Sequence, residues 1–179
     1  MTSAGELIVV SGPPGAGKTT VSALLAELFD PSVLVAGDEF FGFLCNGRID
    51  PWLPESDRQN TTVISAGAAA CGKYVEGGYT VVYDGVVGPW FIERFLDGTG
   101  LKRLHYALLL PGEEKCVERV QTRDAHPFGD VDATRHMYGQ FAESPVATRH
   151  LIRDGEPRLL AESIRLAVGN GSLAYPAAG

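Results

Sequence analysis

A glycine-rich turn that carries one lysine and two threonines is the part of this sequence with the clearest chemistry. Residues 12–19, GPPGAGKT, match the pattern G-x4-G-K-[ST] at every fixed position. In such a loop, glycines let backbone N–H groups turn inward around a phosphate, the lysine bridges terminal phosphates and the threonine hydroxyl binds Mg2+. The alternative is a strand-to-helix turn that binds nothing. We predict that the loop binds the phosphates of ATP through Gly12, Pro13, Pro14, Gly15, Ala16, Gly17, Lys18, Thr19 and Thr20.

Two aspartates follow apolar segments and could complete a site around these phosphates. Asp38 comes after residues 33–36, and Asp84 ends the run TVVYD. Ligands of an open parallel sheet bind outside the carboxyl ends of its strands, so both carboxylates should converge on the loop. We predict that Asp84 holds Mg2+ with Thr19, partly through water, and that Asp38 is the base for an attacking hydroxyl. The alternatives are that Asp38 caps a helix, that Asp84 lies in a turn, and that Asp84 is the base.

Apolar runs alternate with helical patterns along the chain, which indicates an open, mostly parallel sheet with helices on both faces. The expected strands are residues 7–11, 33–36, 80–83, 104–110 and 148–152. The expected helices are residues 18–29, 40–44, 56–76, 89–96, 113–123 and 157–168. We therefore expect one α/β domain over residues 1–179, with a frayed tail from residue 170.

The overall composition excludes several kinds of partner. The chain has 179 residues and a formal net charge of −7, so we expect no attraction to nucleic acid or to an anionic membrane. Cys45, Cys71 and Cys116 are far apart and form no CxxC pair, which favours thiols in a reducing compartment over disulfides or a zinc site. The sequence also shows no signal-peptide pattern and no apolar run of about 20 residues. We expect a cytoplasmic protein, as a monomer or a homodimer.

Three segments together resemble the small P-loop kinases with the fold of shikimate, gluconate and adenylate kinases: GPPGAGKTT, GDEF and VVYDG. Within that group, the chain is most similar to the chloramphenicol phosphotransferase-like and zeta-toxin-like branch. Residues 47–60, GRIDPWLPESDRQN, resemble AAA-type ATP-binding proteins of that branch. The resemblance implies a P-loop NTPase fold with a five-stranded parallel sheet, a helical substrate-binding insert near residues 40–62 and a short lid near 124–135. It also implies that Asp38, the aspartate after the second strand, is the base.

In kinases of this fold, the helix after the fourth strand leads into a lid whose arginines clamp the transferring phosphates. Arg119 and Arg123 occupy the matching place and share one face of the expected helix 113–123. The resemblance therefore implies that Arg119 and Arg123 are catalytic and that Arg119 also contacts the nucleotide. The alternative is a solvated helix whose arginines pair with neighbouring glutamates at the surface.

Residues 45–60, CNGRIDPWLPESDRQN, are the expected acceptor side of the site. This segment joins arginines, an aromatic ring and amides, which suit a polar small molecule with a flat or apolar part. The candidate substrate-binding residues are Arg48, Trp52, Arg58 and Gln59, together with Arg135 from the return of the lid. The alternative is a structural loop anchored by Pro51 and Trp52.

These features together indicate an ATP-dependent kinase that moves the γ-phosphate of Mg-ATP to a hydroxyl of a small molecule, for which an antibiotic-like compound is one candidate. Lys18, Asp38, Arg119 and Arg123 would be its catalytic residues. Two alternatives stay open: a nucleotide-binding switch or ATPase module with slow hydrolysis, and a nucleotide-sugar kinase of the zeta-toxin type. ATP and GTP both suit the loop, because such a loop contacts the phosphates and not the nucleobase.

Overall fold

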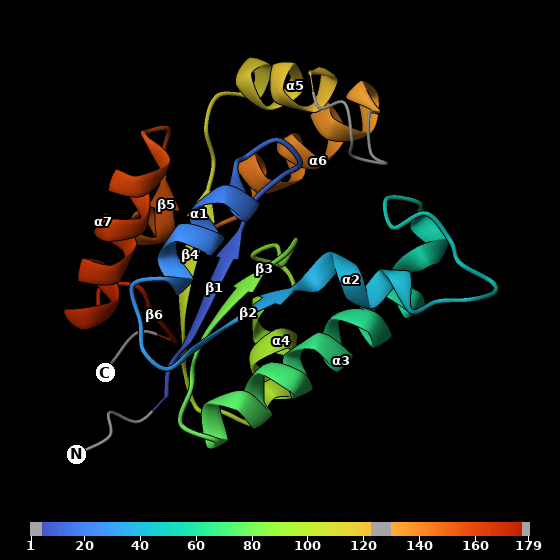
Figure 1. Cartoon of the computed structure of the whole chain (residues 1–179). Coiled ribbons are helices and arrows are strands. Elements are labelled where there is room, and N and C mark those ends of the chain that lie inside the picture. The colour runs from blue at the N-terminus through green and yellow to red at the C-terminus, as the bar shows by residue number, and fades with distance from the viewer. Residues whose placement is uncertain (1–4, 123–129, 177–179) are drawn as a thin grey trace.

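In the computed structural model of this chain, a mostly parallel sheet separates two layers of helices (Figure 1). The structure describes residues 5–122 and 130–176. The strands are β1 (Leu7–Ser11), β2 (Ser32–Ala36), β3 (Thr80–Asp84), β4 (Leu104–Leu109), β5 (Leu151–Ile152) and β6 (Ala174–Tyr175). The α-helices are α1 (Lys18–Ala26), α2 (Gly37–Gly42), α3 (Asp57–Glu76), α4 (Ile92–Thr99), α5 (Glu113–Gln121), α6 (Val131–Glu143) and α7 (Pro157–Gly169), and short 3-10 helices span Pro54–Ser56 and Thr148–His150. No helix within these residues is long and apolar enough to cross a membrane.

The strand order places the glycine-rich loop, residues 12–19, at the middle of the sheet. Five strands run parallel in the order β2-β3-β1-β4-β5, which confirms the predicted parallel α/β fold. From the central strand β1, the chain continues to one side through β2 and β3 and to the other through β4 and β5. Such a reversal opens a crevice at the carboxyl end of the central strand, where ligands of open α/β sheets bind. The glycine-rich loop begins at that end of β1.

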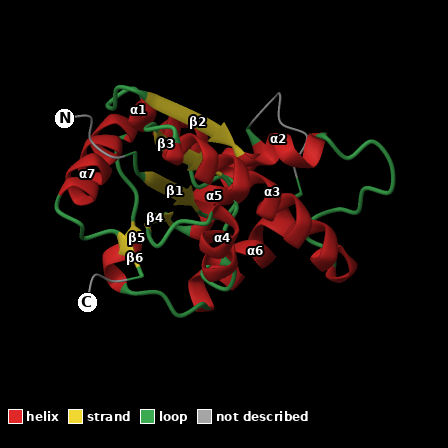
Figure 2. Cartoon of the chain, turned by 90° about the horizontal axis from the view of Figure 1, so that it is seen from below, coloured by secondary structure: helices red, strands yellow, loops and turns green. Residues whose placement is uncertain are grey.

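Each face of the sheet is covered by its own set of helices (Figure 2). The apolar side chains of β1 alternate, so Leu7 and Val9 belong to one core cluster and Ile8 and Val10 to the other. The first cluster joins the sheet to α3 and α4, and the second joins it to α1 and α7. All four side chains are buried, which explains why the strand reads as a continuous apolar run.

Two segments near the C-terminus differ from the prediction. The expected strand 148–152 is shorter, because Thr148–His150 forms a 3-10 helix before β5. The expectation of a frayed tail from residue 170 is wrong up to residue 176, since β6 pairs antiparallel with β4. Leu173 and Ala174 are buried, and this apolar contact gives the segment a reason to pair with the sheet.

The sequence pattern also did not predict α6. This helix begins after Asp130, whose side chain accepts a hydrogen bond from the N–H of Ala133 at 2.9 Å. Its buried Phe141 packs on Trp90, with ring centroids 5.0 Å apart. Both α5 and α6 lie at the carboxyl end of the sheet (Figure 1). The predicted lid near residues 124–135 overlaps the start of α6, and its residues 124–129 lie outside the described part of the chain.

Candidate functional site

The backbone of the phosphate loop, residues 12–19, requires glycine at three positions. Gly12, Gly15 and Gly17 have φ angles of 150°, 76° and 93°, which other residues rarely adopt. A Cβ atom at Gly12 would lie 2.3 Å from the carbonyl oxygen of Leu109, and one at Gly15 would lie 2.2 Å from that of Cys116. The loop therefore lies directly against the end of β4 and against α5, at distances that only glycine allows.

Gly15→Ala is expected to destabilise the protein, because it adds both backbone strain and an overlap with the Cys116 carbonyl. We expect the free energy of unfolding to fall by about 1–3 kcal/mol, the scale of such strain. Gly139→Ala in α6 is the matched control, since a Cβ atom there meets nothing within 4 Å. Urea unfolding compares the two variants, and equal stability would contradict the geometry of the loop.

Lys18 and Thr19 stand where the loop passes into α1. Lys18 Nζ donates a hydrogen bond to the carbonyl oxygen of Pro13 at 3.1 Å, so its ammonium group lies over the loop. Thr19 and Thr20 are exposed. The first turn of α1 contains no acidic residue, and Gly17 at the N-cap position offers no capping side chain. The positive end of the helix dipole is therefore suited to a phosphate at the loop.

The strand register brings Asp84 next to the phosphate loop. Asp84 pairs with Val10 of β1 on one side and with Ala36 of β2 on the other. It is the last residue of β3, so the alternative of a turn aspartate is not supported. Asp38 follows Ala36 by two residues and is exposed. Both aspartates and the loop therefore share the carboxyl end of the sheet, while their chemical roles stay predictions.

Asp38 lies in the first turn of α2 and does not cap it. Ala36 occupies the N-cap position, and no side-chain hydrogen bond caps this helix. The carboxylate of Asp38 is compatible with the positive end of the helix dipole. Capping therefore does not explain an aspartate at this position.

Tyr83 is a neighbour of both aspartates that the sequence pattern did not reveal. Its ring is buried, and a Cβ atom at Gly37 would lie 2.3 Å from its hydroxyl group. Burial raises the pKa of this phenol above its ordinary value, and charges at Cys71, Asp38 and Asp84 raise it further. Tyr83 is therefore a neutral support for the backbone at the start of α2. The glycine directly before Asp38 was the available sequence signal, because it leaves room for the ring.

A buried hydrogen-bond cluster joins the start of the phosphate loop to the segment after β3. Ser11 Oγ donates to the carbonyl oxygen of Val87 at 2.8 Å and accepts from the N–H of Val87 at 2.9 Å. The hydroxyl group of Tyr106 donates to the same carbonyl oxygen at 2.7 Å. Because Ser11 directly precedes Gly12, the cluster fixes the two segments relative to each other.

Replacing Ser11 with alanine should destabilise the fold by about 1–3 kcal/mol, the cost of leaving a buried polar group without its partner. The N–H of Val87 would lose its acceptor in a site where Ser11 and Val87 are fully buried. Ser163→Ala, on the exposed face of α7, serves as the control. Thermal unfolding of the two variants checks the prediction, which fails if both melt at the same temperature.

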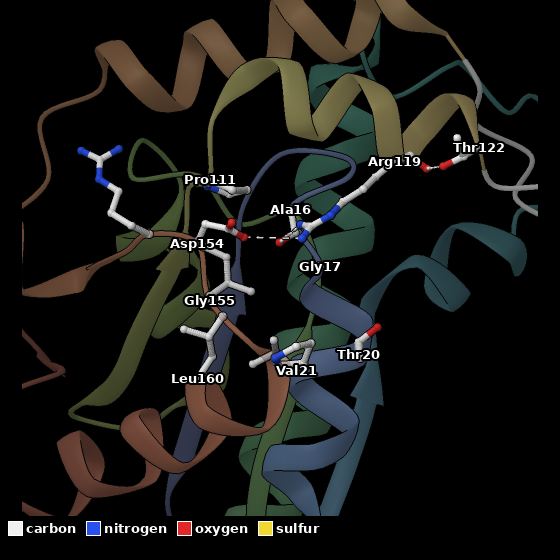
Figure 3. Close-up of a pocket in the computed structure, with 13 residues that line it drawn as sticks. Ala16, Gly17, Thr20, Val21, Pro111, Arg119, Thr122, Asp154, Gly155 and Leu160 are labelled. Carbon is white, nitrogen blue, oxygen red and sulfur yellow. Dashed lines mark hydrogen bonds and ion pairs between the residues drawn. The ribbon is translucent and has the colours of Figure 1, made fainter.

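A cavity of about 300 Å³ lies beside the phosphate loop, between α1, α5 and the segment after β5 (Figure 3). Its lining combines apolar side chains with charged ones: Ala16, Gly17, Thr20, Val21, Leu109, Pro111, Arg119, Thr122, Arg153, Asp154, Gly155, Pro157 and Leu160. This cavity was not among the features predicted from the sequence. The signal was Asp154-Gly155 after the fifth strand, since the rule that selected Asp38 and Asp84 applies equally to this strand end.

Residues 8–134 match the family model described as an AAA domain. This chain belongs to that family. The matched region contains the phosphate loop, both aspartates and Arg119. No curated protein matches this AAA domain in sequence.

Solved structures that resemble this AAA domain include kinases and a resistance protein. The Deinococcus radiodurans tunicamycin resistance protein has 21% identity and a TM-score of 0.69, over 92% of this chain and 96% of that one. A sugar kinase from Janibacter has 17% identity and a TM-score of 0.67, over 92% and 93% of the two chains. The Mycobacterium tuberculosis APS kinase, solved with AMPPNP and APS, has 13% identity and a TM-score of 0.68, over 92% and 98%. The AAA domain thus has the fold of small P-loop kinases.

Arg119 and Arg135, two of the arginines predicted to bind phosphate or substrate, have different surroundings in this AAA domain. Arg119 Nη1 donates to the carbonyl oxygens of Gly15 and Ala16 at 3.3 and 3.4 Å, so this guanidinium group lies at the phosphate loop. Arg135 instead bonds the carboxylates of Glu113 and Glu114, and these ion pairs join α6 to α5. The surface-pairing alternative therefore describes Arg135. Arg123 lies outside the described residues.

The predicted acceptor segment of the AAA domain is held by its own amides. The Gln59 side chain accepts from the N–H of Ile49 at 2.8 Å and donates to its carbonyl oxygen at 2.7 Å. Asn60 Nδ2 donates to the carbonyl oxygen of Pro51 at 2.7 Å. Gln59 therefore has a structural role in this segment, and its assignment to substrate has no support from these contacts.

The same segment projects beyond α2 and α3 from the body of the domain (Figure 1). Arg48 and Arg58 are exposed on it, and Trp52 is half-buried. These three side chains stay candidates for an acceptor that approaches from the α2 side of the sheet.

Proposed function

We propose that this AAA domain transfers the γ-phosphate of Mg-ATP to a hydroxyl group of a small molecule. The observation that carries the proposal is the register of β1, β2 and β3. This register brings Asp84 and the start of α2 to the same edge of the sheet as the phosphate loop. A phosphate loop alone is suited to binding or hydrolysis, whereas a second carboxylate at the same edge supports transfer to an acceptor. The likeness in fold to a sugar kinase and an APS kinase also favours a phosphotransferase.

On the donor side, the loop backbone and Lys18 would bind the phosphates of ATP. The hydroxyl group of Thr19 and the carboxylate of Asp84 are oxygen donors of the kind that Mg2+ prefers, and both lie at the loop. These residues would hold Mg2+, Asp84 partly through water. Bound Mg2+ would offset negative charge on the phosphate oxygens. The cavity beside the loop would bind the adenine ring of ATP, because its lining is largely apolar and includes Arg119.

On the acceptor side, Asp38 would act as the general base. The acceptor hydroxyl passes its proton to the Asp38 carboxylate while its oxygen bonds to the γ-phosphorus, and ADP leaves with the electron pair of the broken P–O bond. Asp38 is exposed in the first turn of α2, so an acceptor can reach it from solvent. Lys18, with Arg119 and Arg123, would offset the charge that develops on the transferring group.

A turnover screen tests this proposed function. The protein is incubated with Mg-ATP and with aminoglycosides, phenicols, sugar acids, nucleosides and nucleotide sugars in turn, and the release of ADP is measured. We expect one acceptor class to stimulate ADP release by the wild type and not by Asp38→Asn. If no acceptor stimulates the release, a switch or a slow ATPase is the better assignment.

A further inference from the structure

Asp154, in the segment between β5 and α7, connects α5 to the cavity beside the phosphate loop (Figure 3). Its carboxylate accepts from Lys115 Nζ and lies 3.5 Å from Arg119 Nη2. These cations stand one helical turn apart on α5, so one carboxylate meets both. The hydrogen bond from Lys115 is the main cause that lowers the pKa of Asp154 below its ordinary value. The carboxylate therefore remains charged at neutral pH.

Arg119 links this carboxylate to the backbone of the phosphate loop. Its Nη1 donates to the carbonyl oxygens of Gly15 and Ala16, while its Nη2 faces Asp154. The N–H and C=O groups of one trans peptide point in opposite directions. A bond from Arg119 to the carbonyl oxygen of Ala16 therefore directs the N–H of Gly17 to the opposite side of the loop. Arg119 thus sets the orientation of the Ala16–Gly17 peptide, whose N–H would face a bound phosphate, whereas the N–H of Ala16 donates to the carbonyl oxygen of Pro13 at 3.2 Å.

We propose that Asp154 is a positioning residue for the phosphate loop, acting through Arg119. The carboxylate fixes the guanidinium plane, and the guanidinium group holds the Gly15 and Ala16 carbonyls away from the phosphate side. The effect on nucleotide affinity rests on the proposed function, whereas the effect on the loop backbone does not. Asp154 itself need not touch the nucleotide for this role.

The direction of the effect separates positioning from simple electrostatics. A carboxylate beside a phosphate site repels an anionic ligand, so neutralising Asp154 would tighten nucleotide binding if charge alone mattered. A positioning role predicts the opposite result, weaker nucleotide binding by the variant, because the loop loses the group that orients Arg119. Glu162→Gln, on the exposed face of α7, removes the same charge at a residue that takes no part in these contacts and is the matched control.

The first measurement is the dissociation constant of Mg-ADP by titration calorimetry. Asp154→Asn is expected to weaken binding about two- to fivefold, the range of a partly exposed ion pair. Arg119→Ala should weaken it about tenfold, as expected for the loss of charge-assisted hydrogen bonds. The double variant should bind no more weakly than Arg119→Ala, because Asp154 acts through that side chain. Unchanged or tighter binding by Asp154→Asn, or additive weakening in the double variant, would overturn the proposal.

The second measurement is amide hydrogen exchange of the protein without nucleotide. Peptides that cover the phosphate loop should exchange faster in Asp154→Asn than in the wild type, while peptides of α4 should not change. Equal exchange in the loop would overturn the positioning role even if nucleotide binding is confirmed. A wild type that binds no nucleotide would instead overturn the proposed function, and the exchange data would still decide the role of Asp154.

Discussion

Lys18→Ala is expected to abolish phosphotransfer while leaving the fold intact. Lys18 Nζ reaches across the phosphate loop to the carbonyl of Pro13 at 3.1 Å, and from this position it can donate to a terminal phosphate. Alanine removes the only side-chain charge that the loop sequence carries, residues 12–19. Loss of one preorganised donor at a site of developing charge costs about 10²–10³ in rate, so turnover should fall at least that far. Steady-state release of ADP in the presence of an acceptor measures the change.

Lys73→Ala is the control for this variant. Lys73 is an exposed lysine on α3 that pairs with Glu76 at 2.7 Å, a surface contact of small energetic effect. Its replacement removes one positive charge and should leave turnover unchanged. Normal turnover by Lys18→Ala would mean that the loop does not act on the transferring phosphate.

Asp38→Asn is expected to spare ATP binding and to remove turnover. Asp38 lies in the first turn of α2 and does not cap that helix, so asparagine should be accommodated without loss of structure. The amide cannot accept the proton of the acceptor hydroxyl, and general bases contribute about 10²–10⁴ to rate. The dissociation constant of Mg-ATP should stay within about twofold of the wild type, because the proposed contact is with the acceptor. Calorimetry and acceptor-stimulated ADP release measure the two quantities separately.

Two further variants make the test of Asp38 specific. Glu39→Gln neutralises the adjacent exposed carboxylate of the same helical turn and should turn over normally. Asp84→Asn should instead raise the Mg2+ concentration needed for half-maximal rate, if this carboxylate holds the metal. An Asp84→Asn variant with normal Mg2+ dependence and no turnover, beside an active Asp38→Asn variant, would assign the base to Asp84.

The backbone of the phosphate loop was predictable from the sequence because its determinants are local. The phosphate loop needs positive φ angles at Gly15 and Gly17, and glycine at fixed spacing records that need directly. The buried strand β1 was equally predictable, since a strand covered on both faces has a continuous run of apolar residues. Asp38 and Asp84 followed from the rule that parallel strands present their carboxyl ends at one edge.

The remaining features depend on contacts between distant segments. Arg135 pairs with two glutamates of α5, and nothing in the local spacing distinguishes that contact from a phosphate clamp. Gln59 binds the backbone of Ile49, which only the path of the loop decides. β6 was not predicted because a two-residue strand carries too little pattern, and it pairs with Leu104 and His105 of β4, ahead of the residues that pair with β5. Asp154 obeyed the strand-end rule, but its partners on α5 became visible only in the fold.

Tracing the γ-phosphate from ATP to its product is the measurement that tests the central proposal most directly. ATP labelled at its γ-phosphate is incubated with Mg2+, the protein and the acceptor that stimulates turnover most, and the labelled products are separated. We predict label on the acceptor with the wild type, and no labelled acceptor with Lys18→Ala or Asp38→Asn. Label recovered only as inorganic phosphate, at the same rate with and without any acceptor, would contradict a phosphotransferase.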